Sequence, residues 1–130
     1  MSSAVISMKE TDTIRGAEWE MNTAEIRHIP VVDQRNHVIG VISNRDLARA
    51  VGKAGNQPTP VAGIMSRAVL TVRPTTPAHE AAAMMLEHKI GCLPVVGDDE
   101  QLVGIITESD FLRVAEKALR GAEIARSSEE

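Results

Sequence analysis

The chain has 130 residues, of which 43% are hydrophobic and 25% are charged, the ordinary balance of one soluble globular domain. A net charge of −4 with only Trp19 and Phe111 as aromatic residues argues against a nucleic-acid partner, because such surfaces need clustered basic and aromatic side chains. The single Cys92 excludes an internal disulfide, no apolar stretch approaches the roughly 20 residues that span a bilayer, and no signal-peptide pattern opens the chain. We therefore expect a cytoplasmic protein with no membrane partner.

The sequence is a tandem duplication. An offset of 64 residues aligns 1–51 with 65–115 without a gap and gives 15 identities in 51 pairs. The densest match compares residues 28–51 with residues 92–115. A repeat of this length is one supersecondary unit used twice.

Each copy predicts the same elements in the same order. The β-branched runs 5–8 and 69–72 predict short strands, and turn residues follow at 10–12 and 74–77. Helical spacing of apolar residues comes next, at Ile14, Ala17 and Met21 in copy one and at 78–85 in copy two. Two strands follow in each copy, at 30–32 and 38–42 and at 94–96 and 102–106. A closing helix should place one apolar face on the core, namely Phe111, Val114, Ala115, Ala118 and Leu119.

A single three-stranded unit with two helices covers only one face of its sheet. The predicted fold class is therefore α/β, in the α+β sense: two tandem β-α-β-β-α repeats packed sheet to sheet about a pseudo-twofold axis. We place repeat 1 at 1–51, a linker at 52–64 that is rich in Gly and Pro, repeat 2 at 65–120, and a polar, fraying tail at 121–130.

The paired motifs of the two copies resemble those of the tandem CBS domain, also called the Bateman module. Residues 28–32 (HIPVV) and 92–96 (CLPVV) are followed by 40–46 (GVISNRD) and 104–110 (GIITESD). The resemblance covers about residues 1–120. It implies a regulatory module that binds adenosine-containing ligands between the copies and often forms homodimers.

The motifs Ser43-x-x-Asp46 and Thr107-x-x-Asp110 allow two readings. Each lies where a strand meets a helix, so a helix cap explains it without any ligand. A carboxylate there can also accept hydrogen bonds from a ribose diol, and the hydroxyl and helix N-terminus can meet a phosphate. Both copies use Asp where capping favours Glu or Gln, and the family's nucleotide contacts fall at these positions.

Further candidate ligand residues surround the two prolines. Arg27 and His28 in copy one, and His88 and Lys89 in copy two, match basic positions that touch phosphate in family members, or they merely complement a helix end. The adenine could be held by apolar residues at these places, although core packing is the simpler explanation for each: Ile29, Pro30, Ile64, Met65, Leu93 and Pro94. Because the given sequence begins at Met1, we expect copy one to lack its own version of the lead-in at 61–64 that precedes copy two, and we expect the completeness of one pocket to depend on this difference.

Nothing in the sequence favours catalysis. Cys92 is most simply a buried structural thiol, His79 and His88 fall on opposite helix faces, and no Walker-type loop occurs. We expect no enzyme, no metal and no required cofactor. We expect an AMP, ADP or ATP sensor that acts on an unidentified regulated protein. The alternatives are a ligand-free scaffolding protein and a binder of S-adenosylmethionine or a dinucleotide.

Trp19 is a candidate for the dimer contact. It lies away from the core-facing positions Ala17 and Met21, and its counterpart in copy two is Ala83, so the core requires no large side chain there. A partly shielded surface residue is the alternative. We expect a homodimer with Trp19 at or near the contact.

Overall fold

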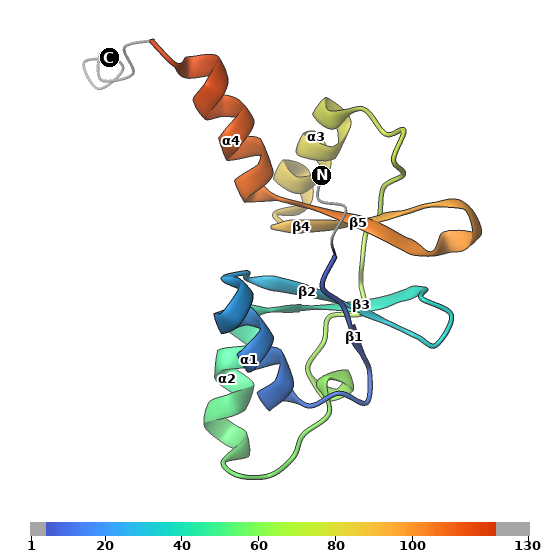
Figure 1. Ribbon diagram of the computed structural model, residues 1–130, viewed down its shortest axis with the longest axis vertical. Coiled ribbons are helices and arrows are strands. Elements are labelled where there is room, and N and C mark those ends of the chain that lie inside the picture. The colour runs from blue at the N-terminus through green and yellow to red at the C-terminus, as the bar shows by residue number, and fades with distance from the viewer. Residues whose placement is uncertain (1–4, 122–130) are drawn as a thin grey trace.

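A computed structural model describes residues 5–121, and it has two α/β repeats whose sheets face each other (Figure 1). The first repeat contains β1 (Met8–Lys9), α1 (Ile14–Ala24), β2 (His28–Val32), β3 (Val38–Ser43) and α2 (Asn44–Ala54). A short 3-10 helix, η1 (Val61–Gly63), follows. The second repeat contains α3 (Ala78–His88), β4 (Cys92–Val96), η2 (Asp98–Glu100), β5 (Leu102–Thr107) and α4 (Glu108–Leu119). The predicted fold class is confirmed.

A side-chain cap begins α1, and a left-handed residue ends both α1 and α3. The Thr13 hydroxyl accepts a hydrogen bond from the Gly16 amide at 3.2 Å and so caps α1. Both α1 and α3 end on a residue in the left-handed conformation, Glu25 (φ 56°) and Lys89 (φ 55°). Their buried faces carry Ile14, Ala17 and Met21 in α1 and Ala81 and Met85 in α3. The predicted spacing is therefore the buried face of α1, and in α3 it holds for Ala81 and Met85, whereas Ala78 is exposed.

The two hairpins have the same register. His28 pairs with Ser43 at the end of the β2–β3 ladder, and Cys92 pairs with Thr107 at the same place in β4–β5. Each ladder shifts register at one point, between its last two valines. Because the side-chain period of a strand is two, equal registers place equivalent residues on equivalent faces.

The predicted first strands are wrong in extent. Only Met8 and Lys9 form β1, parallel to Val31 and Val32 of β2. In repeat 2 the run 69–72 forms no strand, and Val72 alone bridges to Val95. The β-branched residues before these points have strand propensity, but a strand needs a neighbouring ladder to pair with. The chain there crosses between the two repeats (Figure 1).

The two repeats are joined at the hairpin ends by a self-pair. His37 and Gln101 are equivalent residues, and they pair with each other in an antiparallel bridge. Beside them the Leu102 amide donates to the Asn36 carbonyl at 2.9 Å, and the Asn36 side-chain amide donates to the Leu102 carbonyl at 3.0 Å. A residue that pairs with its own counterpart lies on a twofold axis, so the predicted pseudo-twofold passes between His37 and Gln101.

The chain entering repeat 2 docks on the free edge of β3. Val41 and Ser66 exchange two backbone hydrogen bonds, at 3.0 and 2.9 Å. Gly40 permits this approach, because a Cβ there would lie 2.6 Å from the Met65 sulfur and 3.0 Å from the Ser66 carbonyl oxygen. The start of the predicted repeat 2, around Met65, is thus held against repeat 1.

The expected burial of the closing helix is wrong beyond its first turn. Phe111 packs against the second core, but 65% of Val114 and 44% of Leu119 are exposed. The reason is visible in Figure 1, where α2 packs along α1 whereas α4 runs away from α3. The apolar face of α4 is therefore uncovered among the described residues.

The boundaries between repeats differ from the prediction in one respect. Helix α2 continues to Ala54 and Gly55 follows it in the left-handed region (φ 60°), so residues 52–54 belong to the helix and not to a linker. Residues 1–4 of the predicted repeat 1 and residues 122–130 of the predicted tail lie outside the described residues. No helix within 5–121 is long and apolar enough to cross a membrane.

Candidate functional site

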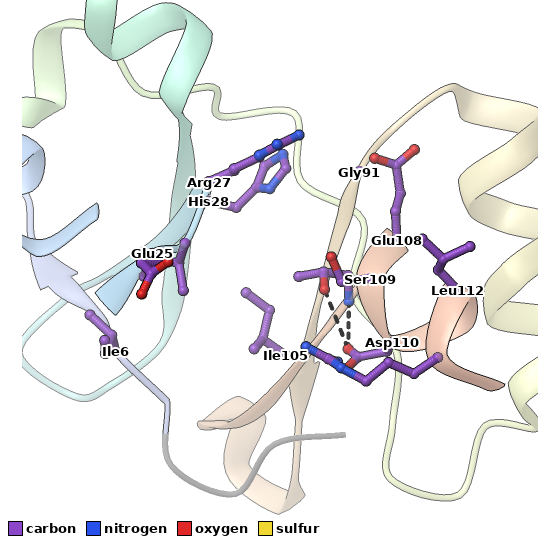
Figure 2. A pocket seen from close by; sticks show the side chains of 13 residues that line it. Ile6, Glu25, Arg27, His28, Gly91, Ile105, Glu108, Ser109, Asp110 and Leu112 are labelled. Carbon is purple, nitrogen blue, oxygen red and sulfur yellow. Dashed lines mark hydrogen bonds and ion pairs between the residues drawn. The ribbon is translucent and has the colours of Figure 1, made fainter. Parts of the chain in front are cut away.

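A cavity of about 790 Å³ opens between the two repeats. Figure 2 shows Glu25, Arg27 and His28 of repeat 1 on one side of it, and Glu108, Ser109 and Asp110 of repeat 2 on the other. Four residues predicted from the sequence meet here: Arg27, His28, Thr107 and Asp110. Two basic side chains of one copy thus face the Thr-x-x-Asp motif of the other copy.

The start of α4 forms the acidic side of the cavity. The Thr107 amide donates to Asp110 Oδ2 at 2.8 Å, and the Thr107 hydroxyl lies 3.5 Å from the same oxygen. Asp110 Oδ1 accepts from Arg113 at 3.0 Å. Asp110 therefore closes a capping box, so the choice of Asp over Glu does not by itself separate a capping role from a binding role.

The same motif in repeat 1 is capped less completely. The Ser43 hydroxyl accepts from the Asp46 amide at 3.2 Å, and Asp46 forms an ion pair with Arg49 at 3.8 Å. Both carboxylates keep an Arg three residues later as a partner. The two helix starts thus present the same groups in the same order.

His28 is half-buried on the basic side of the cavity. A Cβ on Gly91 would lie 3.0 Å from the His28 Cε1 atom and 3.2 Å from Glu108 Oε1, so an added methyl group would press on this ring. Burial lowers the pKa of His28, and Arg27 lowers it further, while the Glu108 carboxylate acts in the opposite direction. The ring therefore favours the neutral form, which can both donate and accept a hydrogen bond.

Cys92, the counterpart of His28, is buried and unpaired by disulfide. Burial raises the pKa of its thiol to about 12, and the Asp110 carboxylate adds to the rise. A thiol with this pKa is protonated at neutral pH and is a poor nucleophile. The sequence-based interpretation of Cys92 as a structural thiol agrees with this environment.

A second, smaller cavity of about 440 Å³ lies along α2. It includes two predicted residues, Asp46 and Ile64. Its wall also carries Arg49, Lys53 and Thr59, which the sequence analysis did not select. Asp46 of the Ser-x-x-Asp motif therefore borders a separate cavity, whereas Ser43 does not line it.

The remaining predicted residues lie elsewhere. Ile29, Pro30, Leu93 and Pro94 are fully buried in β2 and β4, and Met65 is buried against Gly40. Core packing accounts for these five positions. His88 and Lys89 are exposed at the end of α3, outside the residues that line the two cavities.

Several cavity residues were missed by sequence reasoning. Glu25 and Glu108 line the large cavity, as do Arg113 and the apolar Ile6, Ile105 and Leu112. Glu25 and Glu108 were missed because the search was for basic groups that bind phosphate. The alignment of the two repeats held a signal. Arg113 aligns with an identical residue, Arg49, whereas Glu25 aligns with Lys89 and Glu108 aligns with Asn44, so the charge differs at these two positions. No group of three potential metal ligands occurs among the residues that the structure describes.

Comparison with known proteins gives one family. Its model, described as the CBS domain, matches residues 1–53 and again residues 61–117. Protein MK0525 of Methanopyrus kandleri is 34% identical over 112 residues, 85% of this chain and 57% of its own length. A homoserine O-acetyltransferase of Methanococcoides burtonii is 32% identical over 88% of this chain and 23% of the enzyme. The chain thus spans about half and about a quarter of these two relatives.

Solved structures agree over nearly the whole chain. A protein described as an acetoin utilization protein, AcuB, from Vibrio cholerae superposes with a TM-score of 0.82 at 38% identity and covers 92% of this chain and 89% of its own. The CBS domain pair of protein MJ0100, in complex with 5′-methylthioadenosine and S-adenosyl-L-methionine, gives 0.82 at 30% identity, with 91% and 93% covered. CBSX2 in complex with AMP gives 0.74 at 27% identity, with 88% and 89% covered.

Proposed function

This chain belongs to the CBS domain family, and on that basis we propose that it is a regulatory module that binds an adenine nucleotide, AMP, ADP or ATP, between its repeats. The observation that carries the proposal is the cavity of about 790 Å³ in which Arg27 and His28 of one repeat face Thr107 and Asp110 of the other. Its volume is within the range of about 300–1,000 Å³ that small-molecule sites have.

The chemistry of the cavity suits a nucleoside monophosphate or a longer nucleotide. The Asp110 carboxylate has two oxygens, and its outer lone pairs can accept from the two hydroxyls of a ribose. The N-terminus of α4 and the guanidinium of Arg27 attract phosphate. The apolar side chains of Ile6, Ile105 and Leu112 give the base a surface to pack on.

Regulation follows if the ligand prefers one arrangement of the repeats. A molecule that contacts Arg27 and Asp110 together touches both repeats at once, so it stabilises the relative placement that permits both contacts. A regulated protein that recognises this placement would bind more or less tightly when the ligand is present. The regulated protein and a homodimeric state are part of this proposal.

The proposal is tested by a thermal-shift and calorimetry panel of AMP, ADP, ATP, GMP and S-adenosylmethionine. A ligand at 100 times its dissociation constant adds about 2.7 kcal/mol of stability, which raises the melting temperature by several degrees. We expect the adenine nucleotides to stabilise the protein more than GMP does. No heat and no stabilisation at millimolar concentrations of any adenosine ligand would favour a ligand-free scaffolding protein instead.

A second candidate function is supported by two acidic residues. Glu25 and Glu108 line the same cavity as Arg27, and carboxylates favour the positive sulfonium and ammonium groups of S-adenosylmethionine. The related MJ0100 pair was crystallised with that ligand. Stabilisation by S-adenosylmethionine and not by AMP, ADP or ATP would select this alternative.

A further inference from the structure

We infer that two copies of this chain exchange α4, so that α4 of each copy packs on α3 of the other. The inference rests on the homodimer that forms part of the proposed function, and it goes beyond it by naming the segment that joins the copies. It is carried by the uncovered apolar face of α4 and by the way in which repeat 1 covers the equivalent face of α2.

Repeat 1 shows what this face packs against. Helix α2 lies along α1 (Figure 1), and four of its side chains pack in the first core: Leu47, Ala50, Val51 and Ala54. The Arg15 guanidinium of α1 donates to the carbonyl of Gly55, which follows α2, at 2.7 Å. The start of α1 therefore lies beside the end of α2, and the two helices are antiparallel.

Repeat 2 has the same two surfaces, but they do not meet. The residues of α4 that match the packed side chains of α2 are Phe111, Val114, Ala115 and Ala118. Phe111 reaches the second core, whereas Val114 and Ala118 are exposed. On α3 the counterpart of the fully buried Ile14 is Ala78, which is exposed. Within residues 5–121, each surface therefore lacks the cover that its counterpart in repeat 1 has.

The two uncovered surfaces fit each other in size. Helix α3 has Ala78 where α1 has Ile14, and α4 has Val114 where α2 has Ala50. Packed side chains fill the space between helices, so added volume on one helix requires a loss of volume on the other. The larger residues of α4 therefore suit the smaller residues of α3.

The charges of the two surfaces also match. In the antiparallel arrangement that α1 and α2 adopt, the start of α3 would lie beside the end of α4. The first turn of α3 carries Glu80, and the last turn of α4 carries Lys117. Opposite charges across a contact favour the correct partner and register. The surface that suits α4 in both shape and charge is therefore α3.

Helix α4 diverges from its own α3 at the residue that precedes it. The β4–β5 hairpin keeps the register of β2–β3 as far as Thr107, the counterpart of Ser43. The backbone of Thr107 has φ −126° and ψ 169°, whereas that of Ser43 has φ −99° and ψ 156°. From this point α4 runs away from α3 (Figure 1), which leaves its apolar face available to another molecule.

A second copy supplies the missing cover twice. Each copy offers one α3 surface and one α4 surface, so reciprocal exchange forms two identical contacts about a twofold axis. Neither kind of surface then remains uncovered, and assembly ends at the dimer. Trp19 lies on α1, so a contact at that residue is independent of this exchange.

Cross-linking between copies tests the exchange. In repeat 1 the contact joins Arg15 and Gly55, and their counterparts in repeat 2 are His79 and Leu119. The variants His79→Cys and Leu119→Cys are unfolded together, refolded and treated with a short bismaleimide. We expect a product of two chains joined through positions 79 and 119, identified by mass spectrometry. In the control mixture Arg35→Cys, an exposed change in the hairpin turn, replaces His79→Cys and should give no product with position 119.

A variant with both changes, His79→Cys and Leu119→Cys in one chain, identifies the alternative. A cross-link within a single chain would show that α4 packs on its own α3, and it would overturn the inference. A dimer in which positions 79 and 119 of different chains do not cross-link would overturn it as well.

A charge on the face of α4 gives a second readout. Val114 is exposed in a single copy, so Val114→Glu should leave each copy folded. It should raise the dimer dissociation constant at least about tenfold, because the dimer buries this side chain twice. Light scattering on a dilution series measures this change, and an unchanged constant would contradict the exchange. The matched variant Ala50→Glu places the same charge against the first core and should lower the melting temperature instead.

Failure of the exchange is distinguishable from failure of the proposed ligand binding. A monomeric wild-type chain that still binds adenine nucleotides would overturn the exchange and the homodimer alone. A dimer that cross-links through positions 79 and 119 but binds no adenosine ligand would support the exchange and overturn the proposed ligand.

Discussion

His37 and Gln101 occupy the same position in the two copies of the sequence, and in the folded chain they pair with each other. This contact locates the pseudo-twofold axis, because a residue can pair with its own counterpart only where the axis passes. The position of the axis determines which groups meet. It brings the basic residues before the first proline to the helix that follows β5, and so creates one cavity from two distant motifs.

The first prediction separates binding from capping at the acidic residues. Asp110→Asn should lower the affinity for the ligand of the large cavity by about 1.5–3 kcal/mol, because a hydrogen bond to a charged group is lost. The amide oxygen can still accept from the Thr107 amide, so the melting temperature should change little. Asp46→Asn is the matched variant in the other repeat. Unchanged affinity in both variants, together with a lower melting temperature, would assign these residues to capping alone.

A second prediction concerns the packing of His28 against Gly91. In Gly91→Ala the new methyl group would lie 3.0 and 3.1 Å from the His28 ring, so the ring must move. We expect a loss of about 1–3 kcal/mol in unfolding free energy, measured by urea denaturation, and weaker ligand binding. The control is Gly52→Ala in α2, where nothing lies within 4 Å of the added Cβ. That variant should gain about 0.5–1 kcal/mol, and a Gly91→Ala protein as stable as the wild type would contradict the packing described.

The third prediction is a pH dependence that arises at His28. Its pKa in the folded protein lies below the ordinary value of 6.5, chiefly because the ring is buried. The unfolded chain therefore binds more protons between the two pKa values, and stability must fall as pH drops through that window. His28→Gln should reduce this slope in a series of melting temperatures from pH 8 to pH 5.

The controls for this series are two other groups. His79 is exposed on α3, so His79→Gln should leave the slope unchanged. Hydrogen bonds from the His37 and Arg35 amides keep the pKa of Asp33 below 3.8, so its effect on stability falls at a more acidic pH. A slope that persists in full in His28→Gln would show that another group titrates.

The fourth prediction is that the thiol of Cys92 is unreactive in the folded protein. With a pKa of about 12 and a buried side chain, it should resist iodoacetamide at pH 7.5 and react only after denaturation. Mass spectrometry of the native and urea-treated protein gives the readout. Rapid labelling of the native protein would mean that the site opens far more often than its packing implies.

The fifth prediction concerns assembly through Trp19. Its side chain is 63% exposed on α1, as expected of a residue away from the core. Light scattering should give the mass of a dimer, and Trp19→Ala should weaken the dimer, because Trp is a frequent interface anchor. Val103→Ala, a change at an exposed apolar residue of β5, is the control. A monomeric wild type, or a Trp19→Ala protein that dimerises equally well, would remove Trp19 from the interface.

The sequence predicted the hairpins and helices because their signals are local. Pro30 and Pro94 precede paired valines, and Gly40 lies within the run Val38–Ser43 that becomes β3. The extent of β1 was not predictable in this way, since the β-branched residue Ile6 borders the cavity where a strand was expected. The direction of α4 was also missed, because apolar spacing predicts a face but does not identify what covers it.

The candidate site was predicted only in part for a similar reason. Arg27, His28, Thr107 and Asp110 were selected by residue type, and the structure brings them together. Glu25 and Glu108 were invisible to that search, because their meeting depends on the axis and not on any spacing along the chain. Neighbours in space that come from different repeats require the fold before their charges can be compared.

The self-pair at His37 and Gln101 also has a mechanical consequence. It joins the repeats at the turn end of the hairpins, while His28 and Thr107 lie at the opposite ends of the strands. Five strand residues extend over roughly 16 Å. If the repeats rotate about the contact at the turns, the far ends of the strands therefore move furthest. A rotation of a few degrees about this contact changes the distance between the repeats at the far ends by about 1 Å, which is enough to make or break a hydrogen bond. A small molecule that binds at these far ends, between His28 and Thr107, therefore needs the least force to rotate one repeat against the other.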